Sequence, residues 1–343
     1  MKDFIIIGGG IAGLSCAYWL EKKNNQVMLI EKEELGHGAS GRNAGFLTGG
    51  SINYFSRLLE KYGKEKALDI WSFTSQNVAL IKKELNLKEN IKLTESGTIS
   101  LFNADEVELI EKAYGILKEN NFKVEKVNPI FNYADAFKIN TDASFDPKEL
   151  LTCLGATLSK TEIKLFTPCH EIHKVNDHYE VETESGTFKA KRIIFATNSL
   201  LYQFIPELKE IIKPIRAQIA SFKVNAGQIG ESNYLIPSER IYFRRYHNGV
   251  IMGGLRYLDA KTEETIEMEL NQVIQNGIQN KIQSFFGENE VVNRWSGIMG
   301  FTHDEQPIVG CSATDSNIYY IGGFSGHGNG YAFKLAQKLV DML

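Results

Sequence analysis

Apolar positions near the start of the chain form short uninterrupted runs rather than alternating with polar ones. Residues 4–7 are all apolar and mostly β-branched, which predicts a strand buried on both faces. Glycines follow directly. Residues 14–21 then predict a helix, and residues 26–30 predict a second strand that ends at Glu31. The order strand, glycines, helix, strand is therefore complete within thirty-one residues.

The end of the chain repeats the first part of this order. Residues 317–321 predict a strand, five glycines lie between 322 and 330, and residues 331–343 predict an amphipathic helix whose N-terminus can face an anion. Between the two ends, strands are expected at 95–102, 164–172, 179–183, 188–197, 212–224, 240–246 and 250–255, and helices at 73–85, 105–120 and 265–286.

The first glycine run has the spacing of a dinucleotide-binding motif. GGGIAG, from Gly8 to Gly13, fits G-x-G-x-x-G. Gly8 permits the tight turn, Gly10 lets backbone approach a pyrophosphate, and Gly13 lets the helix pack on the strand. Glu31 can accept hydrogen bonds from both ribose hydroxyls, which disfavours NADP. An accidental glycine-rich loop is the alternative, and the ordered context argues against it.

A second segment of small residues, 36–45, follows the second strand almost at once. It holds four glycines and two alanines among hydroxyl and amide side chains. An NAD-binding domain would normally begin another helix and strand here. A small-residue loop suits a ligand that lies along the backbone, such as the ribityl chain, pyrophosphate and ring of FAD, and a flexible surface loop is the alternative. The segment favours FAD over NAD.

With these motifs in place, the sequence resembles the D-amino-acid oxidase family of flavoproteins, which includes glycine oxidase, monomeric sarcosine oxidase and γ-glutamylputrescine oxidase. GASGRNAG is most similar to the amine-oxidising, γ-glutamylputrescine-oxidase-like branch. The motifs that carry the resemblance span the chain in family order: GGGIAG (8–13), IEKEELGHGASGRNAG (30–45), IIFATNSL (193–200), KPIRAQI (213–219), RWSGIMGFTHDEQPIVG (294–310) and GGFSGHGNGYAF (322–333).

The resemblance implies non-covalent FAD, because Cys311 and His37 match no position that relatives use for a covalent flavin bond. In the family, backbone near the position of Cys169 receives the adenine, and the strand ending at Ala196 and Thr197 passes under the cofactor. The candidate cofactor-binding residues are Gly8, Gly10, Ile11, Ala12, Gly13, Glu31, Lys32, Ser40, Gly41, Arg42, Asn43, Ala44, Gly45, Cys169, Ala196, Thr197, Gly297, Gly323, Gly326, His327, Gly328, Asn329 and Gly330.

The length of 343 residues predicts two domains. The fold class implied by the motifs is α/β with an α+β second domain. A Rossmann-like FAD-binding domain (1–45, 146–210 and 294–343) is expected to be interleaved with an antiparallel-sheet substrate-binding domain (46–145 and 211–293) that lies over the flavin.

The resemblance also indicates where a substrate is held. The arginine that clamps the substrate carboxylate in glycine oxidase matches Met299, and a lysine of monomeric sarcosine oxidase matches Gly330. Both clamps are absent, which favours a larger amine or a carboxylate held elsewhere.

Seven residues are candidates for the pocket. Tyr242, Arg244 and Tyr246 alternate on one face of a predicted strand, and an ordinary solvated or interface face is the equal alternative for each. For His327 the alternative is a structural histidine satisfied by backbone, and Arg216 has a structural setting. The candidate pocket residues are Arg42, Tyr242, Arg244, Tyr246, Arg256, Met299 and His327.

Composition narrows the class of partner. The net charge is −4, which disfavours nucleic acid. The four cysteines show no CxxC and no Cys/His spacing, which predicts isolated thiols, no metal site and a reducing, cytoplasmic location. The apolar stretch 4–20 carries nucleotide-binding glycines and is too short to span a membrane comfortably.

The expected function is FAD-dependent oxidation of a primary or secondary amine to an imine, by hydride transfer to flavin N5 followed by hydrolysis. Oxygen or another acceptor then reoxidises the flavin. One alternative is a flavin module acting on a carboxymethylaminomethyl-modified tRNA wobble uridine, which a basic patch beside the pocket would favour. Another is a flavin-binding subunit of a hetero-oligomeric dehydrogenase, which copurification with a partner chain would favour.

Overall fold

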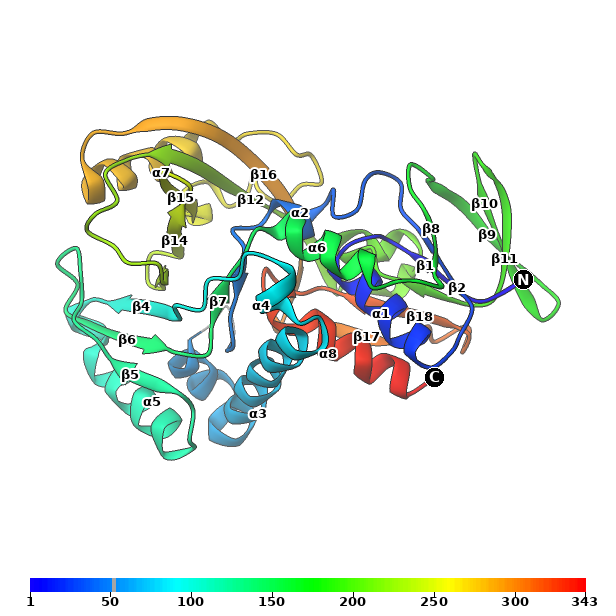
Figure 1. Ribbon diagram of the computed structural model, residues 1–343, viewed down its shortest axis with the longest axis horizontal. Helices are drawn as coiled ribbons and strands as arrows, with labels where there is room; N and C mark the ends of the chain where they lie inside the picture. The colour runs from blue at the N-terminus through cyan, green and yellow to red at the C-terminus, as the bar shows by residue number, and fades with distance from the viewer. Residues whose placement is uncertain (51–53) are drawn as a thin grey trace.

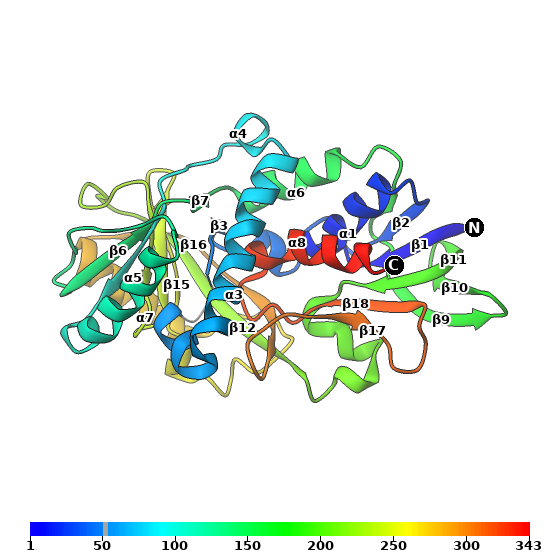
Figure 2. The ribbon, with the colours of Figure 1, turned by 90° about the horizontal axis from the view of Figure 1, so that it is seen from below.

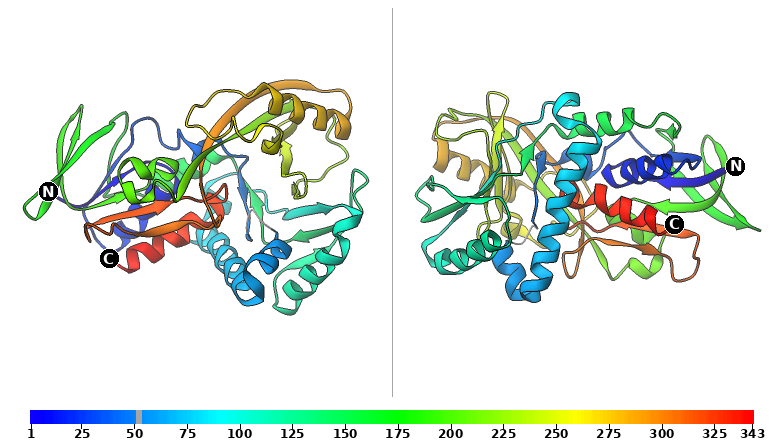
Figure 3. Two further views of the ribbon diagram at one scale, coloured as in Figure 1. Left: turned by 180° about the vertical axis from the view of Figure 1, so that it is seen from behind. Right: turned by 60° about the horizontal axis from the view of Figure 1, so that its bottom comes forward.

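The computed structural model describes residues 1–50 and 54–343. Residues 51–53, in the segment expected to begin the substrate domain, lie outside the described part of the chain. Figure 1 shows two lobes, each built around one large sheet, and Figure 3 shows both termini on the same lobe. None of the described helices is both long and apolar enough to cross a membrane.

The first lobe is a mostly parallel sheet. Its strands run in the order β17–β18–β11–β1–β2–β8, with β9 and β10 attached beside β11. The pairs β18–β11, β11–β1, β1–β2 and β2–β8 are parallel, so the carboxyl ends of these strands lie at one edge. The strands are β1 (Lys2–Ile7), β2 (Val27–Ile30), β8 (Glu162–Lys164), β9 (Cys169–Val175), β10 (His178–Thr183), β11 (Gly186–Phe195), β17 (Ile308–Cys311) and β18 (Ile318–Gly322).

The uniformly apolar start of the chain is buried on both faces, as predicted. Phe4 and Ile6 pack with α1 (Ile11–Lys22) and α8 (Gly328–Asp341) on one face. Ile5 and Ile7 pack on the other face against the short helices η2 (Asn198–Gln203) and η3 (Pro206–Leu208). α1 and α8 therefore cover one face of the first sheet, and η2 and η3 cover the other. The glycine loops 8–13 and 322–330 follow the carboxyl ends of β1 and β18.

The second lobe is a mostly antiparallel sheet, in the order β16–β12–β15–β14–β13–β4–β6–β5, with only β13–β4 parallel among its described pairs. α7 (Gln272–Phe286) packs Ile274, Ile278 and Ile282 on one of its faces. The strands are β4 (Thr98–Phe102), β5 (Val124–Lys126), β6 (Asp135–Ile139), β12 (Ile212–Lys223), β13 (Asn233–Ile236), β14 (Ile241–Tyr246), β15 (Gly249–Gly254) and β16 (Glu290–Thr302).

The remaining elements join the lobes. Figure 2 shows α3 (Phe55–Glu84) running beside α8, and α3 also contacts α5 (Val107–Glu119) of the second lobe. The others are α2 (Ala39–Arg42), β3 (Phe46–Leu47), α4 (Leu87–Asn90), η1 (Ala104–Glu106), β7 (Ala143–Ser144), α6 (Pro147–Ala156) and η4 (Arg256–Asp259).

The predicted fold class, a Rossmann-like domain interleaved with an antiparallel-sheet domain, is confirmed. The exact domain bounds stay a prediction. The bound placed at residue 294 falls inside β16, which pairs with β12 of the second sheet from Glu290 to Thr302.

Two predicted elements were wrong in extent. The strand expected at 164–172 is broken into β8 and β9, because Phe166 has a φ of 51° and Pro168 has no N–H to donate to a ladder. The helix expected at 265–286 begins only at Gln272. The carbonyls of Glu267 and Glu269 accept hydrogen bonds from Arg216 and Gln218, which holds this segment in a non-helical form.

Three further elements differ from the predictions, in their presence or in where they begin: α6, α3 and β16. α6 is an unpredicted helix, although Asp146 accepts a hydrogen bond from the Lys148 N–H as its N-cap and Pro147 is the first helical residue. α3 begins eighteen residues before the predicted start at 73, with a kink at Gly63, where φ is 74°. β16 is an unpredicted strand that contains most of the motif 294–310 from Arg294 to Thr302.

Candidate functional site

The first glycine loop lies at the carboxyl end of β1, between β2 and β11. Gly8 donates its N–H to the Ile30 carbonyl at 2.8 Å, and the Ala196 N–H binds the Ile7 carbonyl at 2.8 Å. Gly8 has a φ of 112°, and a Cβ on Gly13 would lie 1.9 Å from the Gly8 carbonyl oxygen. The turn and the close helix packing predicted for these two glycines are therefore present.

The second glycine segment covers the start of the same helix. Gly10 is the N-cap of α1 and supplies no side-chain cap. The Ser40 hydroxyl accepts a hydrogen bond from the Ile11 N–H at 3.0 Å. Glu31, at the end of β2, accepts from the N–H groups of Gly9 at 2.6 Å and Glu33 at 3.0 Å. A serine hydroxyl, a carboxylate and a helix N-terminus thus converge at this edge of the sheet.

The segment 36–45 is joined to the C-terminal loop by asparagine side chains. The Asn329 amide donates to the Asn43 side-chain oxygen at 3.2 Å and to the Phe46 carbonyl at 3.1 Å. Asn43 in turn accepts from the Gly45 N–H at 2.8 Å. The two loops, distant in sequence, therefore lie against each other.

The C-terminal loop has several positions open to glycine alone. Gly323 and Gly326 have φ values of 65° and 87°, and a Cβ on Gly330 would lie 2.3 Å from the His327 ring. His327 occupies the N-cap position of α8, whose first helical residue is Gly328, but its side chain makes no capping hydrogen bond. The ring hydrogen-bonds to the Thr48 backbone, and its Nε2 has no hydrogen-bond partner in the described part of the chain. Burial lowers the pKa of His327 to about 4, so its imidazole is neutral at physiological pH.

Four other expected cofactor residues lie outside the three glycine loops: Thr197, Gly297, Cys169 and Lys32. Thr197, at the end of β11, has a buried hydroxyl without a partner among the described residues. Gly297 of β16 approaches the Arg42 side chain, because its Cβ would lie 3.3 Å from that of Arg42. Cys169 begins β9, where burial raises its pKa to about 11, and Lys32 is exposed.

These residues fit a bound dinucleotide. The Gly8–Gly13 contact leaves no room for side chains, and the N-cap residue Gly10 supplies no side-chain cap to α1. The Thr197 hydroxyl, which has no partner among the described residues, lies beside them. Glu31 directly follows β2, where a carboxylate would accept hydrogen bonds from the ribose of a bound dinucleotide. Gly8, Gly10, Gly13, Glu31 and Ser40 are the residues that would hold FAD there.

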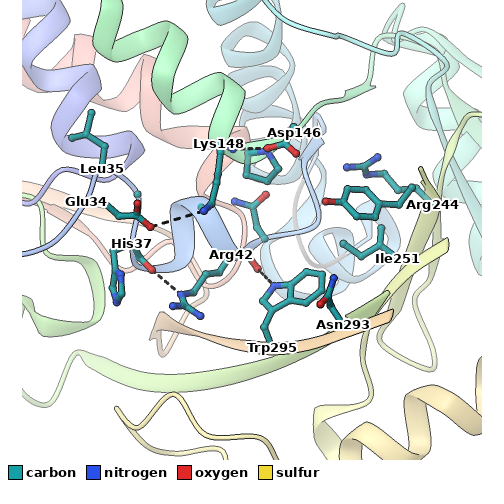
Figure 4. Close-up of a pocket in the computed structure, with 15 residues that line it drawn as sticks. Glu34, Leu35, His37, Arg42, Asp146, Lys148, Arg244, Ile251, Asn293 and Trp295 are labelled. Carbon is teal, nitrogen blue, oxygen red and sulfur yellow. Dashed lines mark hydrogen bonds and ion pairs between the residues drawn. The ribbon is translucent and has the colours of Figure 1, made fainter. Parts of the chain in front are cut away.

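A cavity of about 390 Å³ lies between the second glycine segment, the start of α6 and the second sheet (Figure 4). Arg42, Arg244 and Tyr246, three of the seven candidate pocket residues, line it together. Asp146 and Trp295 also line it, and the Trp295 indole donates to the Arg42 carbonyl at 2.9 Å.

Both arginines of this cavity are already engaged by backbone. Arg244 donates to the carbonyls of Ala44 at 2.6 Å, Phe145 at 3.0 Å and Arg245 at 3.0 Å. Arg42 donates to the His37 carbonyl at 2.8 Å and to the Ser296 carbonyl at 3.4 Å. The hydrogen bonds of Arg244 fix the second glycine segment against β14.

Two further candidates lie elsewhere. Tyr242 and Arg256 are close enough to interact electrostatically, and neither lines the cavity of Figure 4. The Arg256 guanidinium stacks over the Phe301 ring, 4.4 Å from its centroid. Phe301 lies two residues beyond Met299, on the same face of β16. The structure therefore separates the seven candidates into two groups, with His327 in the C-terminal loop.

Sequence reasoning missed Trp295 and Phe301. Both alternate with Gly297 and Met299, so a strand prediction for 290–302 would have placed all four on one face. Arg216 has the structural setting expected of it, because its guanidinium forms a buried ion pair with Glu263 at 2.8 Å.

Comparisons with known proteins give this arrangement its class. The model of the DAO family of FAD-dependent oxidoreductases matches residues 3–342. The chain belongs to this family, which confirms the resemblance seen in the sequence. It is an FAD-dependent oxidoreductase, and its cofactor is FAD.

Relatives cover nearly the whole chain. The probable oxidoreductase OrdL of Rhizobium meliloti is 24% identical, covering 98% of this chain and 82% of that protein. The gamma-glutamylputrescine oxidoreductase of Escherichia coli is 24% identical, covering 99% and 83%. The structure of L-proline dehydrogenase from P. horikoshii superposes with a TM-score of 0.83 at 19% identity, covering 99% of this chain and 92% of that one.

Proposed function

We propose that this chain oxidises a primary or secondary amine of a small metabolite to an imine, which water hydrolyses. The observation that carries the proposal is the wall opposite the second glycine segment. Tyr242, Met299 and Phe301 make this wall apolar and aromatic, and Arg256 is its cation. An apolar surface and a nearby positive charge both lower the pKa of an amine. This wall therefore favours the uncharged amine that oxidation requires.

The protein's part is placement rather than proton transfer. FAD, when bound, accepts the hydride equivalent removed from the carbon next to nitrogen. The glycine loops 8–13, 36–45 and 322–330 hold the cofactor, and the second sheet holds the substrate and keeps water away. His327, in the loop 322–330, stays neutral because burial lowers its pKa to about 4. We also propose that FAD is bound without a covalent link.

Relatives support an amine as the donor. The names of the gamma-glutamylputrescine oxidoreductase and of the L-proline dehydrogenase both refer to nitrogen-bearing substrates. The position that matches the glycine oxidase arginine is Met299, which supports an amine larger than glycine or one held by another residue.

The test is the detection of C–N cleavage. The FAD-loaded protein is incubated with glycine, sarcosine, proline, putrescine and γ-glutamylputrescine, once with oxygen and once with an artificial electron-accepting dye. Carbonyl products are trapped with a hydrazine. We expect a trapped carbonyl from at least one amine. Turnover of glycerol 3-phosphate or another alcohol, with no carbonyl from any amine, would contradict the proposal.

A further inference from the structure

Arg256 differs from the other partly buried arginines in having no hydrogen-bond acceptor. Within residues 1–50 and 54–343, no carbonyl or carboxylate oxygen accepts a hydrogen bond from its guanidinium, and its recorded contact is the Phe301 ring at 4.4 Å. By contrast, each of five other arginines donates to at least two acceptors: Arg42, Arg216, Arg244, Arg245 and Arg294.

A partly buried guanidinium without a hydrogen-bond acceptor is energetically unfavourable. Burial and the positive charge of Arg240 both lower the pKa of Arg256, although a guanidinium stays charged. Nearby Glu263 is already engaged by Arg216, Gln218 and Asn271. The charges of Glu305 and Glu263 raise the pKa of Arg256, but neither accepts a hydrogen bond from it, nor does any other described residue. A partly desolvated guanidinium without an acceptor is a candidate for pairing with a ligand.

Tyr242 lies on the same face of the second sheet as Phe301, over which the Arg256 guanidinium stacks. Gly253 is the cross-strand neighbour of Tyr242, and a Cβ on Gly253 would lie 2.4 Å from the Tyr242 hydroxyl oxygen. The absence of a side chain at Gly253 thus lets the phenol lie across β15. The phenol is near enough to Arg256 for the two groups to interact electrostatically. Burial raises the pKa of Tyr242, so its hydroxyl remains a hydrogen-bond donor.

This face of the sheet is the one that meets the second glycine segment. Ile219 pairs with Gly253 on one side and with Trp295 on the other, so Tyr242, Ile219 and Trp295 project in the same direction. Trp295 contacts Arg42 of the glycine segment through the hydrogen bond at 2.9 Å. Along β16, Phe301 and its stacked guanidinium follow on that face.

We propose that Arg256 is the residue that binds the substrate, and that together with Tyr242 it pairs with a carboxylate carried by the amine. A planar guanidinium and a phenol hydroxyl can donate to both carboxylate oxygens at once. Phe301 fixes the plane of the guanidinium. This inference rests on the proposed amine oxidation, and it specifies an amine that bears a carboxylate rather than a simple alkylamine or polyamine.

The first experiment compares charged and neutral substrates of equal size. Arg256→Met and Arg256→Lys are assayed in the FAD-loaded protein with sarcosine against sarcosinamide, proline against prolinamide, and 4-aminobutanoate against 4-aminobutanamide. Lys223→Met is the matched control, because it removes an exposed charge from β12, which pairs with both β15 and β16. Visible absorbance reports FAD content, so a folding defect is seen separately.

The expected result is a selective effect on KM. Arg256→Met should raise KM for the carboxylate member of the accepted pair about 10- to 100-fold, and change KM for the amide less than about 3-fold. Arg256→Lys should recover part of the loss, and Lys223→Met should match the wild type. Equal effects of Arg256→Met on both members of the pair would overturn the proposal.

A second measurement does not depend on turnover. Propanoate and propanamide, which cannot be oxidised as amines, are titrated into the FAD-loaded protein while the visible flavin spectrum is recorded. Propanoate should perturb the wild-type spectrum, and Arg256→Met should weaken its binding at least 10-fold. If no amine is oxidised but propanoate still binds through Arg256, the amine proposal fails and the anion site stands. Propanoate binding unaffected by Arg256→Met would overturn the site itself.

Discussion

Replacing Asp142 by asparagine is expected to stabilise the protein at neutral and alkaline pH. The Asp142 side chain is fully buried, in the turn before β7. One carboxylate oxygen accepts the Gly49 N–H at 2.9 Å, and the other has no partner in the described structure. Desolvation raises the pKa of Asp142 from 3.8 to about 7, against the opposing effects of the Gly49 N–H, the Thr98 hydroxyl and Lys82.

The sign and size follow from proton linkage. Below pH 3.8 the folded and unfolded chains both carry the proton, so Asp142 contributes nothing to the pH dependence. Between 3.8 and about 7 the unfolded chain releases the proton while the folded chain retains it, so stability falls as pH rises. At about 1.4 kcal/mol per pH unit, the loss reaches about 4 kcal/mol above pH 7. Asp142→Asn removes this loss and keeps an oxygen for the Gly49 N–H.

The assay is guanidinium unfolding of both proteins at pH 4.5, 6 and 8. The free energy of unfolding of Asp142→Asn relative to wild type should increase steadily with pH. Most of the about 4 kcal/mol should be gained between pH 4.5 and 7. A stability difference that does not change with pH, or one that falls as pH rises, would refute a buried carboxyl with a raised pKa.

Three further substitutions test other parts of the structure. Gly13→Ala should cut FAD affinity at least 10-fold, measured by flavin fluorescence, because its Cβ would lie 1.9 Å from the Gly8 oxygen, and Gly115→Ala, with open space around it, should not. Arg216→Met should cost about 3–5 kcal/mol in guanidinium unfolding by leaving Glu263 unpaired, and adding Glu263→Gln should recover part of it. His327→Gln should leave the pKa values of the kcat profile between pH 6 and 9 unchanged, because His327 already titrates near 4. A shift of those values would mean that His327 changes its protonation state during turnover.

Local patterns were enough to predict the frame of the first lobe. A wholly apolar run before GGGIAG has one natural place in a parallel sheet, and β1, α1 and β2 are found where the periodicity put them. The limits appear where tertiary contacts override propensity. Residues 265–271 have a helical pattern, yet the buried Arg216 and Gln218 side chains donate to the carbonyls of Glu267 and Glu269, and the segment is not helical.

The candidate site shows the same contrast between what local patterns predict and what only tertiary contacts decide. The ribose contact expected of Glu31 stays a prediction. Motif spacing predicted the tight turn at Gly8 and the close helix packing at Gly13, because each is a contact within one βαβ unit. It could not tell Arg244 from Arg256, since both are cations near the ends of strands in the second sheet. Only the fold shows that three backbone carbonyls engage Arg244 while Arg256 lies over Phe301 without an acceptor.

The most direct test of an FAD-dependent amine oxidation is the anaerobic visible spectrum of the purified protein, recorded before and after adding each amine of the panel. We expect the absorbance bands of oxidised flavin and their bleaching by one class of amine. A protein that neither carries FAD nor takes it up would contradict an FAD-dependent activity. A flavin spectrum that no amine bleaches would contradict amine oxidation.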